Sequence, residues 1–248
     1  MATILSINTS GNKGMVAIAK DGVCLQSLYN YEAMQHAAFL QPAIQQLLVN
    51  AGIRASQVDA VAVSNGPGSY TGLRVGLASA KGLCFAWDKP LITISSLKVM
   101  AFSVCQNMSL SNSSAKEGSQ LEIEGTNDKK SLPVMYCPMI DARRMDAFFA
   151  LYNEDMDEVI SATATSIDQG FLSEYLEDYR IVFVGTGAGK WQAITNHPNA
   201  RFEPEPLLDK ALCLLSEQEY ALSNFDMLGT AAPFYAKEFY STHPANRV

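Results

Sequence analysis

A glycine-rich turn between a strand and a helix constrains this 248-residue chain more than any other stretch. The apolar run 58–63 is typical of a buried strand, and a Gly-Pro-Gly sequence follows it at 66–68. This sequence predicts a tight turn, because proline fixes one φ angle and glycine permits positive φ at the others. Either Ser69 or Thr71 is placed to cap the helix that we expect next.

Small residues recur at every fourth position of that helix, at Gly72, Gly76, Ala80 and Cys84. A glycine inside a helix costs about 1 kcal/mol relative to alanine, so two of them indicate that another segment approaches closely. If this stripe lies inside the fold, it lets the helix pack on its own sheet. If it lies outside, it admits a partner helix. We expect a mixture, in which one face covers the sheet and another meets a partner.

Composition narrows the class of protein. The net charge of −7 argues against strong nucleic-acid binding by the chain alone, because lysine and arginine supply most phosphate affinity. The five scattered cysteines include no CxxC pair, which is typical of reduced thiols in a cytosolic protein. The start of the chain does not resemble a signal peptide, and no apolar run approaches the roughly 20 residues that cross a bilayer. We therefore expect a cytoplasmic protein without membrane contact.

The first hundred residues predict the element order βββαβαβα. An Asp-Gly turn at 21–22 between apolar runs indicates a hairpin, so the first three strands are expected to form an antiparallel meander. The expected strands are 3–7, 15–20, 23–28, 58–63 and 91–94. The expected helices are 35–50, the helix with the small-residue stripe at 72–84, and 96–105. A meander followed by βαβα is the layout of a lobe of the actin-like ATPases, which place two related lobes around a cleft.

A polar break at 106–131 separates this half from a second one. The second half predicts strands 134–140, 146–152, 159–163 and 181–184, helices 167–176 and 206–225, and an extended end at 233–237. The expected fold is therefore α/β and actin-like (ASKHA, or ribonuclease H-like), with a mixed sheet and helices in each of two lobes. We expect an N-terminal lobe over 1–105, a polar insertion over 106–131 and a C-terminal lobe over 132–248.

Four residues are candidates for nucleotide binding: Asn8, Asp141, Gly185 and Gly187. Actin-like ATPases usually have aspartate in the first turn, whereas Asn8 carries no charge for a metal, so this turn is either structural or a remnant phosphate site. The glycines belong to a GTGAGK sequence after a strand, which fits either a purine contact or a plain strand-to-helix turn.

Charges around residues 141–146 leave two interpretations open. Asp141 and Asp146 flank Arg143 and Arg144, so the carboxylates serve either acid–base chemistry or a charged turn held by Asp–Arg contacts.

Arg74 lies one turn into the helix that carries the small-residue stripe, where the helix dipole disfavours a positive charge. We expect it to meet an acidic group or a backbone carbonyl, the alternative being a solvated side chain.

Several further stretches carry a family resemblance. They are 4–10, His36 with Leu40 and Pro42, the GPGSYTGLRVG sequence at 66–76, 95–97, 140–143, 148–150 and 233–237. Together they resemble the TsaB (YeaZ) family over nearly the whole chain apart from 106–131. The resemblance implies a non-catalytic subunit for forming threonylcarbamoyladenosine in tRNA beside the anticodon. It implies a TsaD-type catalytic subunit and a TsaE-type ATPase as partners, a possible homodimer, and contact with tRNA only through the complex.

The resemblance also implies where partners bind and which cofactors matter. The expected interface lies on the two N-terminal helices, at His36, Leu40, Ile44, Tyr70, Thr71, Gly72, Arg74, Val75 and Gly76. No cofactor is expected to bind this chain strongly, with ATP and Mg²⁺ entering only through the complex, and no metal or catalytic residue is assigned. The alternative is an actin-like small-molecule kinase or ATPase with Asp141 as its candidate carboxylate. A peptidase is disfavoured, because the three histidines form no i, i+4 pair.

Overall fold

The computed structural model describes residues 2–32, 35–116 and 132–237, which fold around two five-stranded sheets. The first sheet holds β1 (Thr3–Asn8), β2 (Gly14–Lys20), β3 (Val23–Asn30), β4 (Ala60–Gly66) and β5 (Leu91–Ser95) in the order β3-β2-β1-β4-β5. The second sheet holds β6 (Val134–Asp141), β7 (Asp146–Tyr152), β8 (Glu158–Ser166), β9 (Arg180–Val184) and β10 (Ala200–Glu203) in the order β10-β9-β6-β7-β8.

The two sheets share one topology. In each, the first three strands form an antiparallel meander, and the next two add in parallel on the other side of the first strand. The helices are α1 (His36–Ala51), the 3₁₀ helix η1 (Ala55–Gln57), α2 (Tyr70–Trp87), α3 (Ser96–Lys116), α4 (Ser173–Asp178), α5 (Ala188–Gln192) and α6 (Asp209–Ala221). This repeated arrangement confirms the predicted α/β fold of actin-like type with two lobes, which we call the first and second lobes after their sheets.

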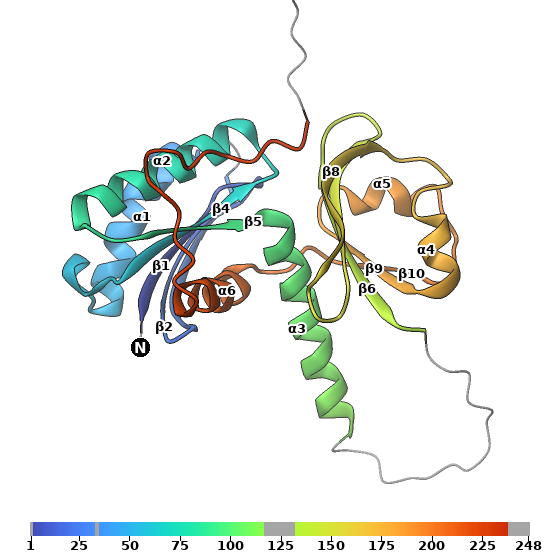
Figure 1. Cartoon of the computed structure of the whole chain (residues 1–248), viewed down its shortest axis with the longest axis horizontal. Helices are drawn as coiled ribbons and strands as arrows, with labels where there is room; N and C mark the ends of the chain where they lie inside the picture. The colour runs from blue at the N-terminus through green and yellow to red at the C-terminus, as the bar shows by residue number, and fades with distance from the viewer. Residues whose placement is uncertain (1, 33–34, 117–131, 238–248) are drawn as a thin grey trace, which may run out of the picture.

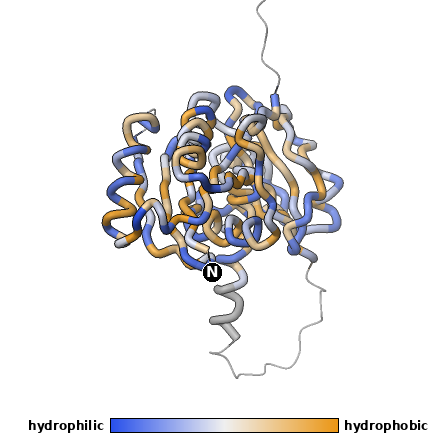
Figure 2. The backbone as a smooth tube through the Cα atoms, turned by 60° about the vertical axis from the view of Figure 1, so that its left-hand side comes forward, coloured by the Kyte–Doolittle hydropathy of each residue, from blue (hydrophilic) through white to orange (hydrophobic). Residues whose placement is uncertain are grey.

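Alternation along the strands gives each sheet two apolar faces. In β1, Leu5 and Ile7 pack with α1 and α2, while Ile4 packs with α6 on the opposite face. In β6, Cys137 packs with α4 and α5, while Tyr136 packs with α3. Figure 2 shows these apolar stretches gathered inside the molecule. The result is a layered molecule in which helices cover both faces of both sheets.

Helices α3 and α6 lie together between the two sheets (Figure 1). Residues of α6 pack on the first sheet, and Ser6 Oγ of β1 lies 3.3 Å from Ser216 Oγ of α6. Farther along, Asp226 Oδ2 accepts a hydrogen bond of 2.8 Å from the N–H of Thr93 in β5. The expected C-terminal lobe of 132–248 is therefore corrected, since α6 and the segment after it belong with the first lobe. Tertiary contacts assign α6 and the segment after it to the first lobe, whereas their sequence pattern is compatible with packing on either sheet.

Helix boundaries differ from the predicted ones in three places. The helix expected at 96–105 runs on as α3 to Lys116, so the first part of the predicted insertion is helical, and 117–131 lie outside the described residues. The helix expected at 167–176 is the shorter α4, and that expected at 206–225 is confined to α6. Helix α1 continues through Pro42, and the edge strand β10 was not predicted.

The small-residue stripe of α2 lies inside the first lobe. A Cβ atom added at Gly72 would meet the carbonyl oxygen of Thr9, and one added at Gly76 would meet Thr9 Oγ1. Thr9 Oγ1 in turn donates a 2.7 Å hydrogen bond to the carbonyl oxygen of Gly72. The stripe therefore lets α2 approach the turn after β1, which is the internal alternative of the two left open above.

Candidate functional site

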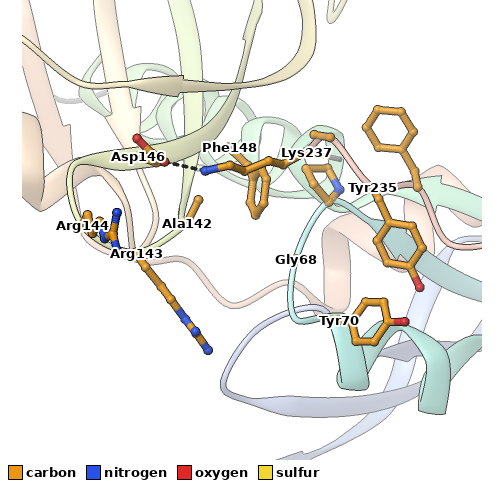
Figure 3. A pocket seen from close by; sticks show the side chains of 12 residues that line it. Gly68, Tyr70, Ala142, Arg143, Arg144, Asp146, Phe148, Tyr235 and Lys237 are labelled. Carbon is orange, nitrogen blue, oxygen red and sulfur yellow. Dashed lines mark hydrogen bonds and ion pairs between the residues drawn. The ribbon is translucent and has the colours of Figure 1, made fainter. Parts of the chain in front are cut away.

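A well-formed pocket lies between the lobes and has a volume of about 550 Å³. Small-molecule sites typically occupy about 300–1,000 Å³, so this space fits a ligand. It is lined by Pro67, Gly68, Tyr70, Ala142, Arg143, Arg144, Asp146, Phe148, Phe234, Tyr235, Ala236 and Lys237. The glycine-rich turn supplies one wall, the β6–β7 hairpin faces it, and the C-terminal segment 234–237 joins the two (Figure 3).

The wall on the first lobe is aromatic. The rings of Tyr70 and Tyr235 lie with their centroids 5.3 Å apart and their planes tilted by 39°. The guanidinium of Arg74 lies 4.1 Å from the centroid of the Tyr70 ring, and its Nε donates a 3.1 Å hydrogen bond to Tyr235 Oη. The expected acidic or carbonyl partner of Arg74 is therefore corrected, because a tyrosine hydroxyl and an aromatic face hold this side chain.

The wall on the second lobe is cationic. Arg143 and Arg144 form the tip of the β6–β7 hairpin with φ angles of 71° and 49°, a region that glycine and asparagine favour. The N–H of Arg143 donates a 2.6 Å hydrogen bond to Asp141 Oδ1, which fixes the turn. Neither guanidinium has a hydrogen bond or ion pair within the described parts of the chain. Figure 3 shows both arginines across the pocket from Tyr70 and Tyr235.

The carboxylates beside the arginines are paired with lysines. Lys190 Nζ lies 2.6 Å from Asp141 Oδ1, and Lys237 Nζ lies 2.6 Å from Asp146 Oδ2. Burial raises the pKa of Asp141, but hydrogen bonds from Lys190 and the N–H of Arg143 outweigh it and lower the pKa below its usual value. The Lys237 hydrogen bond likewise lowers the pKa of Asp146. Of the two interpretations left open, the contacts fit a charged turn, in which Asp141 accepts from the N–H of Arg143 and both carboxylates pair with lysine side chains instead of arginine side chains.

Actin-like ATPases hold a nucleotide beside the turn after their first strand. In this chain, protein atoms nearly fill the corresponding space beside Asn8. Asn8 and Thr186 line a cavity of about 40 Å³ there, far smaller than the 300–1,000 Å³ or so of a typical ligand site. Asn8 Oδ1 accepts hydrogen bonds from Ser10 N at 3.0 Å and Ser10 Oγ at 2.8 Å, which is a structural use of this side chain. In this conformation the cleft does not fit a nucleotide.

The glycines of the GTGAGK sequence have a packing reason. A Cβ atom at Gly185, where φ is +98°, would meet the carbonyl oxygen of Met139, and one at Gly187 would lie 3.1 Å from the carbonyl carbon of Ile140. Both glycines thus let the turn after β9 lie against β6. Of the four candidate nucleotide residues, Asn8 faces the small cavity and Asp141 binds Lys190, so the structure does not bring them together as one open site.

The expected interface residues divide into two groups. His36, Leu40, Ile44, Gly72 and Gly76 are buried, so they do not themselves present a surface to a partner, and the prediction is corrected for these five. His36 Nε2 instead lies 3.0 Å from the carbonyl oxygen of Gly11. The other group is accessible: Tyr70, Thr71 and Arg74 are exposed, and Val75 is half-buried.

Sequence reasoning assigned no pocket role to Phe148, Phe234, Tyr235 or Lys237. Their signal was available only as motif residues at 148–150 and 233–237, because Tyr235 lies 165 positions after Tyr70 and only the tertiary structure brings both to one pocket. Within the residues that the structure describes, no group of three or more His, Cys, Asp or Glu side chains is arranged to hold a metal ion. No helix in these ranges is long and apolar enough to cross a membrane.

Comparison with known proteins gives sequence matches over part of the chain. A family model, "TsaD: tRNA N6-adenosine threonylcarbamoyltransferase", matches residues 30–115. The chain is 41% identical over 101 residues to "tRNA threonylcarbamoyladenosine biosynthesis protein TsaB" of Haemophilus influenzae, covering 40% of this chain and 42% of the relative. It is 32% identical over 99 residues to the protein of the same name from Bacillus subtilis, covering 40% of this chain and 43% of that one. The alignments thus span about two fifths of the length of these curated relatives.

A solved structure extends the likeness of the fold to both lobes. "YeaZ from Pseudomonas aeruginosa" superimposes with a TM-score of 0.74 and 24% identity, covering 95% of this chain and all of that one. Two five-stranded sheets of one topology, with a small cavity beside Asn8, define a two-lobed protein of actin-like fold. Within that class, the chain is similar over about two fifths of its length to proteins named TsaB, and over both lobes its fold is similar to that of YeaZ.

Proposed function

We propose that this chain is a partner subunit in the formation of threonylcarbamoyladenosine in tRNA, supporting a TsaD-type transferase without catalysing the transfer itself. The observation that carries the proposal is the position of the family match along the chain. The TsaD family match over 30–115 contains all of α1 and α2, and curated relatives named for threonylcarbamoyladenosine biosynthesis match about two fifths of the chain.

The outward face of α2 supports a partner site on these helices. Ala78 and Gly82 are exposed one turn apart, and an added Cβ at Gly82 would meet nothing within 4 Å. Phe85 follows on the same face with 84% of its surface exposed, and Val49 near the end of α1 is 73% exposed. A glycine without a packing reason costs an exposed helix about 1 kcal/mol, and small residues allow close helix contact. The surface of Arg74, Ala78, Gly82 and Phe85, which we call the α2 outer face, is the proposed contact.

The contacts around the closed cleft support a non-catalytic role. Asn8 uses its amide oxygen on Ser10, and the carboxylate of Asp141 is paired with Lys190. An actin-like kinase needs a carboxylate in its first turn and a second one free in the cleft. The alternative of a kinase or ATPase therefore lacks the groups that its chemistry needs. In the proposed complex, ATP and Mg²⁺ enter only through the assembly, a TsaE-type ATPase joins it, and this chain contacts tRNA only through the complex.

The test is co-purification with the TsaD homologue of the same organism. Gly82→Arg places a long charged side chain in open space on the α2 outer face, so we expect a folded protein that loses the partner. Gly189→Arg is the matched control, because Gly189 is an exposed glycine of helix α5 with nothing within 4 Å of an added Cβ. If Gly82→Arg still co-purified with the partner, the α2 outer face would not be the contact surface. Threonylcarbamoyl transfer by the purified chain alone would overturn the non-catalytic role.

A further inference from the structure

We propose that the 550 Å³ pocket between the lobes is a binding site for a phosphorylated nucleoside, held with its base against the Tyr70–Tyr235 wall and its phosphate at Arg143 and Arg144. This site is separate from the closed cleft beside Asn8. The inference stands on the pocket alone and does not depend on the proposed function.

The first step concerns charge. Arg143 and Arg144 are exposed, and within the described ranges their guanidinium groups have no hydrogen-bonding or ion-pair partner. The nearby carboxylates of Asp141 and Asp146 are already paired, at 2.6 Å, with Lys190 and Lys237. The hairpin tip is therefore a local excess of positive charge on a chain whose net charge is −7. Guanidinium groups bind phosphate bidentately, so a phosphate is the anion that this tip fits.

The second step concerns the hairpin backbone. Two successive arginines adopt positive φ angles of 71° and 49°, a conformation that a non-glycine residue adopts at a cost. The turn is held by Asp141 Oδ1, which accepts from the N–H of Arg143, and by the carbonyl oxygen of Arg143, which accepts from the N–H of Asp146 at 3.0 Å. This fixed turn keeps both side chains at the pocket, as Figure 3 shows. Pre-set positions reduce the entropy that binding a phosphate costs.

The third step concerns the opposite wall. Tyr70 and Tyr235 lie 5.3 Å apart at their ring centroids, Phe234 lines the pocket from the same C-terminal segment as Tyr235, and Phe148 lines it from β7. A purine or pyrimidine stacks on such rings, and stacking of one base contributes about 1–3 kcal/mol in single-strand binding. The Arg74 guanidinium lies over the Tyr70 ring and adds a cation beside it. A nucleotide joins a planar base, which fits the aromatic wall, to an anionic phosphate, which fits the cationic wall.

The same chemistry comes from two sources, a free mononucleotide or one nucleotide of an RNA chain, and the experiment separates them. Titration calorimetry on the full chain uses AMP, adenosine, inorganic phosphate and a single-stranded RNA pentamer as probes. We expect AMP to bind at least about tenfold more tightly than adenosine or phosphate, since each lacks one half of the ligand. Binding of the pentamer at least about tenfold more tightly than AMP identifies RNA as the source, and equal or weaker binding identifies the free nucleotide.

Variants test the two walls separately. The double variant Arg143→Gln, Arg144→Gln should weaken AMP binding at least about tenfold, because charged hydrogen bonds to the phosphate are lost. Tyr70→Leu should weaken AMP and adenosine alike. Arg180→Ala, at an exposed arginine outside the pocket lining, is the matched control and should bind as the wild type. Circular dichroism establishes that each variant is folded. Saturable AMP binding that survives the double variant would overturn the proposal. The absence of binding by any of the four probes would overturn it as well.

Discussion

Lys237 Nζ lies 2.6 Å from Asp146 Oδ2, and this contact ties the C-terminal segment to the second lobe. Three residues earlier, the N–H of Phe234 donates a 2.8 Å hydrogen bond to the carbonyl oxygen of Asn65 in the first lobe. The segment 234–237 thus spans the gap between the lobes along one side of the pocket (Figure 1). Its two ends are held by different kinds of contact, one of them ionic and therefore dependent on pH.

The first prediction follows from the ionic end. The hydrogen bond from Lys237 lowers the pKa of Asp146, so the stability that the pair contributes is present above the ordinary aspartate pKa of about 3.9. It is lost as the pH falls through the lowered value. In Lys237→Met, carboxyl-carbon NMR should find the Asp146 pKa raised towards its ordinary value. An unchanged titration in this variant would mean that Lys237 does not hold the carboxylate in solution.

The second prediction contrasts two glycines of α2. Gly76→Ala should destabilise the chain by about 1–3 kcal/mol, because the added methyl meets Thr9 Oγ1 in a packed interior. Gly82→Ala should stabilise it by up to about 1 kcal/mol, since the site is exposed, the space is open and alanine favours the helix. Urea unfolding measures both. Equal effects in the two variants would contradict the internal position of the stripe.

These glycines also mark how far the sequence predicts the fold. The alternation of apolar residues, the Asp-Gly turn at 21–22 and the Gly-Pro-Gly turn at 66–68 are local signals, and the strands and turns that they predict are present. The direction in which Gly72 and Gly76 face is not local, because it depends on where the turn at Thr9 lies in three dimensions. The same reason explains why α6 was expected in the second lobe.

The candidate site was predictable only in its pieces. The arginine pair, Tyr70 after the glycine-rich turn and the 233–237 segment can each be read from the sequence. Their convergence on one pocket requires the hairpin tip at Arg143 to face Tyr70 across the lobes, which no spacing in the chain encodes. The closed state of the cleft beside Asn8 is likewise a matter of packing, although the missing aspartate already pointed away from metal chemistry.

The third prediction concerns the thiols. Burial raises the pKa of Cys84 to about 11, and its Sγ donates a 3.4 Å hydrogen bond to the carbonyl oxygen of Pro90. Cys137 and Cys213 are buried as well, whereas Cys24 and Cys105 are partly exposed. At pH 8, a disulfide reagent such as Ellman's should therefore modify only Cys24 and Cys105 in the native protein, and all five after denaturation. Rapid modification of Cys84 in the folded chain would contradict the packing of α2 on the first sheet.

The last prediction returns to the start of α2, where the sequence left two capping residues open. Ser69 Oγ accepts a 3.2 Å hydrogen bond from the N–H of Gly72, and its own N–H donates a 2.7 Å bond to the carbonyl oxygen of Ser10. Ser69→Ala should cost about 1 kcal/mol of unfolding free energy, because a helix N–H loses its acceptor. Thr71→Ala, at an exposed neighbour within the helix, should change it by less than about 0.5 kcal/mol. Ser69→Thr should restore most of the loss, whereas equal losses in the two alanine variants would show that Ser69 does not act as the cap.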